Sequence, residues 1–577
     1  MRLFPTVVWI AGMAWCAAPI PGQTPAGDDL PLEEILASLA ANRLEDLCSL
    51  LASPKVEEPL STVLEAIALP TARATHFIPE TPDIRSLAGS IEVRRAIHPE
   101  KQALVPLAEA IAHFHLRSRD AVETRRAVKV FSITPGPQSG ACRTRQFVSS
   151  LIRRPGELSE LEAEWSADWS FDPERPGQSF RLQSLTVDHQ EETVRKDASQ
   201  PFLADCTRAV LAGSGRFEEL ILRDNVFWRH QIEAALYPDP FGWNGLAVAD
   251  VDGDGLEDLY LCHFGGLPNQ LFLRQPGGSF RDAAAEAGLD LLDNSQAALF
   301  ADFDNDGDQD CAVSTTAGLA LFRQESPLRF TLIERFEHID RAYSLAVADP
   351  DGDGDLDLYV CQYYPGDAEP GALAAPWPIF DARGGGRNVF LRNDGALRFT
   401  DATADSGFEE ENQRFSYAAV WEDFDNDGDP DLFVANDFGR NQLYRNDSGR
   451  FRDVSSETGL EQGAFGMSAC TGDFDLDGFM DIYVSNMFSS AGSRVTGQDW
   501  FKPGGDPGLR ARFQHLTQGN TLLRNRGGLR FEDVSFSQRV HMGRWSWGSL
   551  FADLNNDGWE DLLVANGMIT GRQPDDL

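Results

Sequence analysis

Six times between Asp250 and Asp561 the chain repeats a nine-residue pattern, Asp-x-Asp/Asn-x-Asp-Gly-x-x-Asp. Carboxylates at positions one, three, five and nine concentrate so much negative charge in one turn that a hard cation is needed to neutralise it. Oxygen-only ligands on a flexible loop suit calcium better than zinc or copper, which favour nitrogen and sulfur. The glycine at position six permits the positive-φ backbone that folds a loop around an ion. The pattern therefore predicts up to six structural calcium sites.

The predicted ligands are the side chains at positions one, three, five and nine of each copy. They are Asp250, Asp252, Asp254 and Asp258; Asp302, Asp304, Asp306 and Asp310; Asp349, Asp351, Asp353 and Asp357; Asp423, Asp425, Asp427 and Asp431; Asp473, Asp475, Asp477 and Asp481; and Asp553, Asn555, Asp557 and Asp561. Asn555 replaces an aspartate, and ligand charge helps to set calcium affinity. The sixth loop is therefore expected to bind calcium more weakly than the other five.

An EF-hand shares the first six positions of this pattern. It also requires a bidentate Glu at position twelve and a helix on each side. Position twelve is Leu261 in the first copy and valine in the other five. The flanks, such as SLAVAD and DLYVC around the third copy, are short and rich in Val, Leu and Tyr, which is typical of strands. Each copy is therefore predicted to be a β-hairpin whose turn holds the ion.

A second pair of strands follows most copies. Each pair has a first strand, a Gly-containing turn and a strand with Phe-x-Asp, or a close variant of it, and the pairs start at Asn269, Asn388, Asn441 and Asn520. The loops begin 52, 47, 74, 50 and 80 residues apart, a period near 50 with insertions at about 365–386 and 488–519. A four-stranded repeat of this length is typical of a β-propeller blade. Both insertions are predicted to be excursions at one rim.

These loops, with their Asn-x-Leu-x-Arg-Asn and Phe-x-Asp strands, resemble FG-GAP/VCBS repeats, the unit of the integrin α-subunit propeller. The stretches SNMFSSAG at 485–492, GNTLLRN and WSWGSLFADLNNDGWEDLLVANG are similar to bacterial relatives of cartilage acidic protein, which often carry an ASPIC/UnbV segment. The resemblance covers about 241–577 and implies a calcium-binding propeller of six to seven blades. It implies no single biochemical role, because propellers of this kind serve adhesion, ligand binding and scaffolding alike.

The sixth repeat departs from this pattern, because it lacks the Asn-x-Leu and Phe-x-Asp strands. Two explanations stay open. Either the chain is a truncated product, which is the favoured explanation, or an earlier strand closes the ring. GRFEEL at 215–220 is similar to the GRFRDV strand of the fourth repeat and is the candidate for that closing strand.

The chain before the repeats shows other patterns. Residues 1–26 have an early Arg2, a short apolar core and a small, polar exit, as a secretory signal peptide has; a retained anchor is the alternative. Residues 27–125 are predicted to be a helical segment. Residues 126–240 are predicted to form an antiparallel α+β domain, cystatin-like or NTF2-like, because its later strands alternate apolar and polar residues. The fold class is thus mainly β, a propeller at 241–577 preceded by a smaller α+β domain.

The sequence also predicts individual helices and strands before the repeats, and the state of four cysteines in the chain. Helices are predicted at 30–51, 55–68 and 101–115, and strands at 127–133, 142–152, 161–171 and 180–194. Cys142 and Cys206 are candidates for a disulfide. Cys262 and Cys361 occupy the same position in different blades and are predicted to be buried strand residues.

Composition restricts the function. Ninety Asp and Glu residues against 50 Lys and Arg residues give a formal net charge of −40, which disfavours binding to nucleic acid or anionic membrane surfaces. The sequence has no G-x-S-x-G, H-E-x-x-H or P-loop motif. Core packing is favoured for Trp421, Trp545 and Trp547. An alternative ligand face is formed by His263, Arg494, Trp500, His515, His541 and Trp545.

The sequence therefore predicts a non-enzymatic, calcium-binding propeller that acts as an adhesion or ligand-binding scaffold. It is expected to be secreted, periplasmic or at the cell surface, with no membrane span once the signal is removed. Its partner is expected to be an extracellular protein or glycan, and its oligomeric state stays open. Two alternatives remain. One is a carbohydrate-binding propeller, which needs aromatic platforms, and the other is an enzyme with its site in the N-terminal domain or the propeller funnel.

Overall fold

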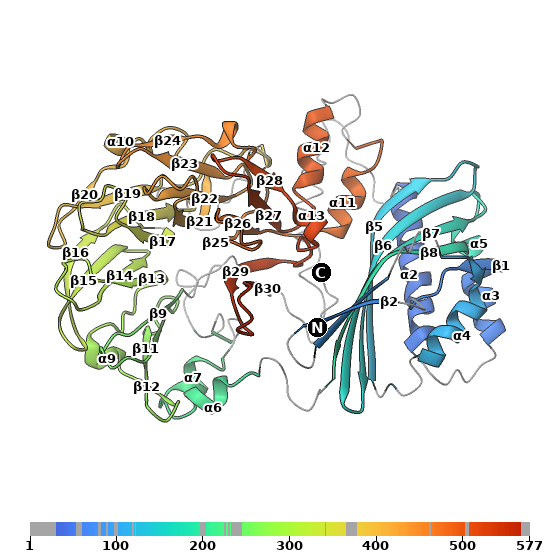
Figure 1. Ribbon diagram of the computed structural model, residues 1–577, viewed down its shortest axis with the longest axis horizontal. Helices are drawn as coiled ribbons and strands as arrows, with labels where there is room; N and C mark the ends of the chain where they lie inside the picture. Colours follow the sequence, from blue (N-terminus) through green and yellow to red (C-terminus); the bar gives the residue numbers. More distant parts are fainter. Residues whose placement is uncertain are drawn as a thin grey trace. The chain divides into compact units, whose positions relative to one another are not determined.

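The computed structural model contains two compact units (Figure 1). One comprises the chain up to residue 204 together with 489–517, and the other comprises 205–488 and the chain from 518. The residues described are 31–52, 60–78, 82–87, 91–96, 102–117, 121, 123–196, 204–223, 227–228, 231, 245–340, 342–364, 378–460, 463–501 and 507–566. The predicted signal peptide and much of the first insertion lie outside these residues.

The first unit packs helices against one eight-stranded sheet. Its helices are α2 (Leu32–Ala52), α3 (Leu60–Ile67), α4 (Leu107–Arg117), α5 (Pro176–Ser179), α11 (Ser490–Thr496) and α12 (Pro507–His515). Its strands are β1 (Ala68–Ala74), β2 (Pro82–Leu87), β3 (Ile91–Ala96), β4 (Val105–Pro106), β5 (Glu123–Pro135), β6 (Ala141–Arg154), β7 (Glu157–Ser170) and β8 (Arg181–Arg195). The sheet order is β2-β3-β8-β7-β6-β5, and β1 pairs with β4 and β8.

The long strands form because their residues alternate. Along β6 and β7 buried and more exposed side chains follow one another, and the buried row includes Trp165 and Trp169. This apolar face joins a core with Leu44 and Leu47 of α2. The predicted helices and the strands β5 to β8 are confirmed, with shifted ends. The strands β1 to β4 are not predicted by the sequence pattern, because they are short and lie in the segment predicted to be helical.

The second predicted insertion is not a propeller rim element. It forms α11 and α12, which belong to the first unit. Helix α11 packs along β5, the last strand of the sheet order. Arg494 pairs with Glu34 of α2 at 2.7 Å and donates a hydrogen bond to the carbonyl of Val130 at 2.9 Å. Gln498 donates to the carbonyl of Ile133. The insertion therefore covers backbone acceptors on an edge strand.

The second unit consists of antiparallel sheets, one for each repeat. The first four sheets are β9 (Leu246–Ala249), β10 (Asp258–Leu261), β11 (Gln270–Arg274) and β12 (Phe280–Asp282); β13 (Ser295–Ala301), β14 (Asp310–Thr315), β15 (Gly318–Ser326) and β16 (Arg329–Phe336); β17 (Ala342–Ala348), β18 (Asp357–Gln362), β19 (Val389–Asn393) and β20 (Phe399–Asp401); and β21 (Phe415–Glu422), β22 (Asp431–Asp437), β23 (Gln442–Asn446) and β24 (Phe451–Asp453).

The fifth sheet also has four strands, and the sixth has two among the described residues. They are β25 (Ser468–Gly472), β26 (Asp481–Ser485), β27 (Thr521–Asn525) and β28 (Phe531–Asp533), and then β29 (Ser546–Ala552) and β30 (Asp561–Asn566). Two short helices, α6 (Thr207–Leu211) and α7 (Phe217–Leu220), precede the first sheet. Others lie between consecutive sheets: α9 (Ala284–Ala287), α10 (Thr403–Ser406), η3 (Ser455–Glu457) and α13 (Ser535–Gln538).

These sheets are the blades of a propeller, as the sequence predicts. The inner strands β9, β13, β17, β21, β25 and β29 contact one another in succession. Buried apolar clusters lie between consecutive blades; Leu358 and Leu391 of the third blade, for example, pack with Phe303 and Leu321 of the second. Trp421 lies next to such a cluster, as predicted, in contact with Phe390.

Two finer predictions are wrong, namely the closing strand at 215–220 and the disulfide between Cys142 and Cys206. The candidate closing strand at 215–220 contains α7 instead. Its residues Phe217 and Leu220 are buried while Glu218 and Glu219 are exposed, so the apolar spacing is helical. Phe217 packs against Phe272 of the first blade.

Cys142 and Cys206 form no disulfide. Cys142 is buried in β6, Cys206 is exposed beside α6, and both are free thiols. Cys262 and Cys361 are fully buried, as predicted. No helix in the described part of the chain has both the length and the apolar character needed to cross a bilayer.

Candidate metal centres

Each acidic loop joins the inner strand of a blade to its second strand. In the first loop the Asp250 carboxylate accepts hydrogen bonds from the backbone N–H groups of Asp254 at 3.0 Å and Gly255 at 2.9 Å. The first aspartate of every other loop accepts the same two bonds. The position-six glycines have positive φ, from 84° at Gly255 to 98° at Gly428. The side chain at position one therefore holds the loop in a turn.

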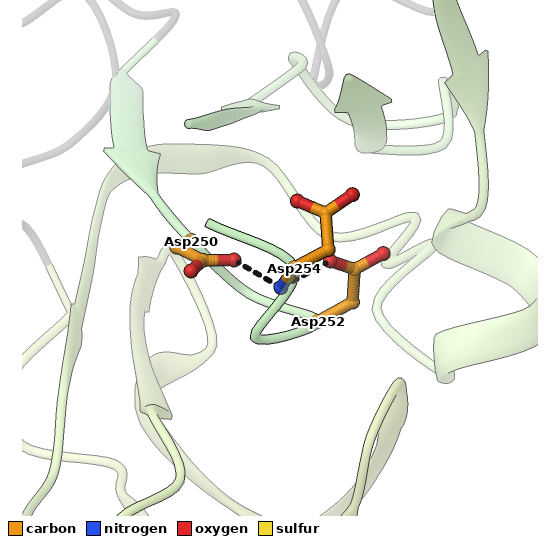
Figure 2. A group of neighbouring side chains, drawn as sticks. All are labelled: Asp250, Asp252 and Asp254. Carbon is orange, nitrogen blue, oxygen red and sulfur yellow. Dashed lines mark hydrogen bonds between the residues drawn. The ribbon is translucent and has the colours of Figure 1, made fainter. Parts of the chain in front are cut away.

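Five loops bring three carboxylates together, with one oxygen from each within 4.8 Å of the others. The groups are Asp250, Asp252 and Asp254; Asp302, Asp304 and Asp306; Asp349, Asp351 and Asp353; Asp423, Asp425 and Asp431; and Asp473, Asp475 and Asp481. Figure 2 shows the first group, with Asp250 and Asp252 both hydrogen-bonded to the backbone nitrogen of Asp254. The first three groups use position five, and the last two use position nine.

Position three supplies the oxygen best suited to a cation. Buried Oδ1 atoms of Asp304, Asp425, Asp475 and Asn555 have no hydrogen-bond partner among the described residues. Buried polar atoms are rarely left without a partner. Burial and the neighbouring carboxylates raise the pKa of Asp304, Asp425 and Asp475. A hard cation would satisfy these oxygens and remove the repulsion, so the donor set fits such an ion.

The aspartate at position nine has a second role, because its carboxylate connects the loop to the third strand of its blade through hydrogen bonds. In the fourth loop Asp431 accepts hydrogen bonds from the backbone N–H groups of Phe424 and Asn446. Burial raises the pKa of Asp431 and Asp481 to about 7, and that of Asp310 to about 6. The position-nine carboxylate thus positions the loop even where it lies outside the carboxylate group.

The sixth loop differs from the other five in its carboxylates, because Asn555 stands at position three. Among the described residues no group of three carboxylates forms there. Asp553 still accepts the N–H groups of Asp557 and Gly558, and Asp561 still accepts that of Leu554. The backbone of the loop is therefore preserved while its ligand set is reduced.

The fifth loop has a basic side chain beside it that was not among the predicted site residues. Arg524 of β27 forms ion pairs with Asp475 at 2.5 Å and Asp477 at 2.9 Å. In the fourth blade the equivalent Arg445 instead pairs with Asp447, two residues further along the chain and just after the strand ends. The signal was available in the sequence, because Arg526 stands where the fourth blade has Asp447.

Three of the six side chains proposed for the alternative ligand face contact other residues. Arg494 is engaged by Glu34, as described above. His263 is buried beside Gln270, with 3.0 Å between Nε2 and the amide oxygen, and burial lowers its pKa. His541 stacks on Phe536, with ring centroids 4.2 Å apart. These side chains therefore have packing roles.

An aromatic cluster lies at the other end of the blades, where the inner strands begin. It consists of Tyr343, Tyr363, Tyr364, Tyr417 and Trp547, which we call the axial aromatic cluster. Ring centroids lie 5.3 Å apart for Tyr343 and Tyr417 and 6.0 Å apart for Tyr417 and Trp547. Because these rings come from the third, fourth and sixth blades, they meet near the axis that the blades share.

The backbone pairing of the inner strands is irregular at three of these rings, and this irregularity sets the direction of their side chains. The register shifts at Tyr343, Tyr417 and Trp547, each near the start of its strand. Such bulges re-aim side chains. Behind the rings, the Tyr363 hydroxyl donates a hydrogen bond to the buried Asp437 carboxylate at 2.5 Å. Burial raises the pKa of Asp437 to about 7. Tyr343, Tyr364 and Trp547 keep part of their surface exposed.

Comparisons with known proteins agree with the repeat pattern. Residues 250–313, 302–360 and 423–484 match the family model of the FG-GAP-like repeat. Cartilage acidic protein 1 of Xenopus tropicalis is 29% identical over 167 residues, which cover 26% of this chain and 24% of that protein. The chain therefore matches about a quarter of the length of this curated relative.

Two solved lectins share a loose likeness. A lectin of Agrocybe aegerita that recognises non-reducing terminal N-acetylglucosamine has 12% identity and a TM-score of 0.31, covering 85% of this chain and 96% of its own. The six-bladed fucose-binding lectin of Aleuria aurantia has 11% identity and a TM-score of 0.26, covering 71% and 94%. The fold rests instead on the repeats and their sheets: this chain carries FG-GAP-like repeats, folded as blades of a β-propeller.

Proposed function

We propose that this chain is an exported, non-enzymatic propeller that calcium stabilises and that serves as an adhesion or ligand-binding scaffold. The observation that carries this proposal is the set of five carboxylate groups, three of which contain a buried oxygen without a partner among the described residues. Calcium accepts irregular sets of carboxylate and carbonyl oxygens, whereas magnesium requires near-ideal octahedral geometry. The loops therefore favour calcium of these two ions.

The role proposed for the ion is structural. Each loop closes a hairpin between two strands of one blade, and its carboxylates also accept backbone hydrogen bonds of that hairpin. The groups contain aspartate alone, without a nucleophile or a histidine among their described members. Export agrees with this role, because extracellular modules bind calcium at about 10⁻⁴–10⁻³ M. The expectation of export itself rests on the sequence pattern of residues 1–26.

Metal counting and calorimetry test the calcium proposal. Protein stripped with a chelator and dialysed against calcium should retain several ions per chain, and magnesium should not displace them at equal concentration. The variant Asp425→Asn with Asp427→Asn should lose one ion. The matched control is Asp405→Asn, which removes an exposed carboxylate outside the acidic loops and should lose no ion. A metal-free protein after dialysis against millimolar calcium would overturn the proposal.

The axial aromatic cluster favours a second candidate, carbohydrate binding. Partly exposed Tyr and Trp rings beside hydroxyl groups offer both stacking surfaces and hydrogen bonds, as small-ligand sites do. The described residues form one shared cluster rather than a platform in every blade, so a single sugar site would be expected. A glycan array should then lose its signal with Tyr343→Ala or Trp547→Ala. It should keep the signal with Trp559→Ala, which changes an exposed tryptophan in the sixth loop.

A further inference from the structure

Three buried asparagines end the third strands of blades three, four and five: Asn393, Asn446 and Asn525. Each is fully buried. Their backbone N–H groups donate to the position-nine aspartate of the same blade, at 2.7, 2.8 and 2.7 Å respectively. This bond fixes each asparagine to the acidic loop of its own blade.

The side chains of the same asparagines reach the loop of the preceding blade. The Nδ2 atom of Asn393 donates to the carbonyl of Phe303, that of Asn446 to Pro350 and that of Asn525 to Phe424, each at 2.7 Å. All three acceptors are at position two of a loop, between two predicted ligands. Every asparagine therefore joins two successive acidic loops.

Two loop asparagines add links at the exposed side. Asn305, at position four of the second loop, donates to the Gly354 carbonyl at 3.1 Å and to Asp355 at 2.8 Å in the third loop. Asn426, at position four of the fourth loop, donates to the Gly478 carbonyl of the fifth loop at 3.0 Å. Loops two to five thus form one hydrogen-bonded series.

The first two blades show what happens without such an asparagine. Gln324 occupies the equivalent place in the second blade, and its backbone N–H donates to Asp310 in the same way. Its side-chain amide donates instead to the Gln309 carbonyl of its own blade. The first blade has Arg274 at this place. The described residues show no equivalent bond from Gln324 to the first loop.

We propose that Asn393, Asn446 and Asn525 couple the acidic loops two to five, so that a calcium ion in one loop raises the calcium affinity of its neighbour. This inference rests on the calcium binding proposed above. An ion draws the carboxylates of its loop together and fixes the position-two carbonyl between them. The asparagine then holds the next position-nine aspartate in its binding position before that loop is filled. By linkage the effect is reciprocal.

Hydrogen exchange of the full chain, read by mass spectrometry at graded calcium concentrations, gives a calcium midpoint for each loop separately. Disabling loop three with Asp351→Asn and Asp353→Asn should raise the midpoint of loop four by about fivefold or more, the usual lower range of coupling. In an Asn446→Ala background the same disabling should leave the loop-four midpoint unchanged. In a Gln324→Ala background the coupling should persist.

A purely structural role for Asn446 would lower the melting temperature without removing this dependence. If Asn446→Ala does not fold, Asn426→Gly tests the fourth and fifth loops, since loops one and three carry glycine at position four. It should reduce their coupling while leaving that of loops three and four intact. Wild-type loops without calcium midpoints would refute the proposed function. Wild-type loops that bind independently, or equal effects of Asn446→Ala and Gln324→Ala, would refute the coupling alone.

Discussion

The fourth and fifth acidic loops share their pattern and their backbone hydrogen bonds, yet the equivalent arginine beside each loop has a different partner. In the fourth blade Arg445 pairs with Asp447 at 2.7 Å and leaves the loop carboxylates to one another. In the fifth, Arg524 pairs with Asp475 and Asp477 of the loop itself. A guanidinium that already neutralises two predicted ligands competes with an incoming cation. Ligand count within the loop therefore does not decide affinity alone.

Removing the metal should have the largest effect on stability, because the contributions of all the calcium sites are lost together. It also tests whether loops four and five bind calcium at all. If each site has a Kd of ~100 µM, the tight end of the range for extracellular modules, millimolar calcium contributes roughly 1.4 kcal/mol per site. Several such sites together reach the stability of a typical domain, about 5–15 kcal/mol. Chelation should therefore lower the melting temperature by more than about 10 °C, and calcium should restore it better than magnesium. Asp425→Ala with Asp427→Ala should reproduce part of the loss. An unchanged melting curve in the verified metal-free protein would remove the basis of the comparison.

Strand β22 offers a sharper comparison, because buried aspartates stand at both of its ends. Burial raises the pKa of Asp431 and Asp437 to about 7, but only Asp431 belongs to an acidic group. For Asp437 the folded pKa exceeds the unfolded value near 3.8, so stability is lost as pH rises from about 4 to about 7. The loss is roughly 4 kcal/mol for a shift of this size.

At saturating calcium, Asp437→Asn should therefore flatten the fall in unfolding free energy between pH 5 and pH 8, measured by denaturant titration. The exposed Asp405→Asn should preserve the wild-type slope. Omitting calcium should make the unfolding free energy fall more steeply with pH in both Asp437→Asn and the wild type, because Asp431 then titrates as well. A variant with the wild-type pH profile would show that Asp437 is ionised at no cost.

The arginine itself can be redirected. Arg526→Asp gives Arg524 a partner two residues further along the chain, as Asp447 does for Arg445. Release of Asp475 and Asp477 should lower the Kd of loop five about fivefold to tenfold, since partly exposed ion pairs contribute roughly 1 kcal/mol. The reciprocal change, Asp447→Arg, should weaken loop four. Calcium midpoints from hydrogen exchange would decide this, and two unchanged midpoints would contradict the competition.

The smallest effect is expected at the sixth loop. Asn555→Asp restores the missing carboxylate and should tighten that loop by about threefold to tenfold. The matched control is Asn556→Asp, which adds the same charge at position four, where no ligand is expected. Equal tightening by both variants would mean that general electrostatics, and not ligation, sets the affinity of this loop.

The sequence pattern predicted those parts of the structure that are determined by residues close together in the chain. The loops and the strands on each side of them follow from a nine-residue spacing, and burial of Cys262 and Cys361 follows from their place in a strand. Arg524 was missed because its loop partner Asp477 is 47 residues away. Helix α7 was mistaken for a strand because four residues, Phe217–Leu220, carry almost no periodicity. The strands β1 to β4 depend on pairing with one another or with β8, and nothing local indicates that pairing.

The position of α11 in the chain determines when the first unit can be completed during synthesis. The first unit is discontinuous: residues 205–488 are synthesised between its sheet and the helices that cover β5. At about 5–20 residues per second, roughly 15–60 s separate these two parts on the ribosome. During that interval the edge of β5 is without α11, while successive blades emerge. The amino-terminal unit, although made first, is therefore completed only after most of the propeller has been translated.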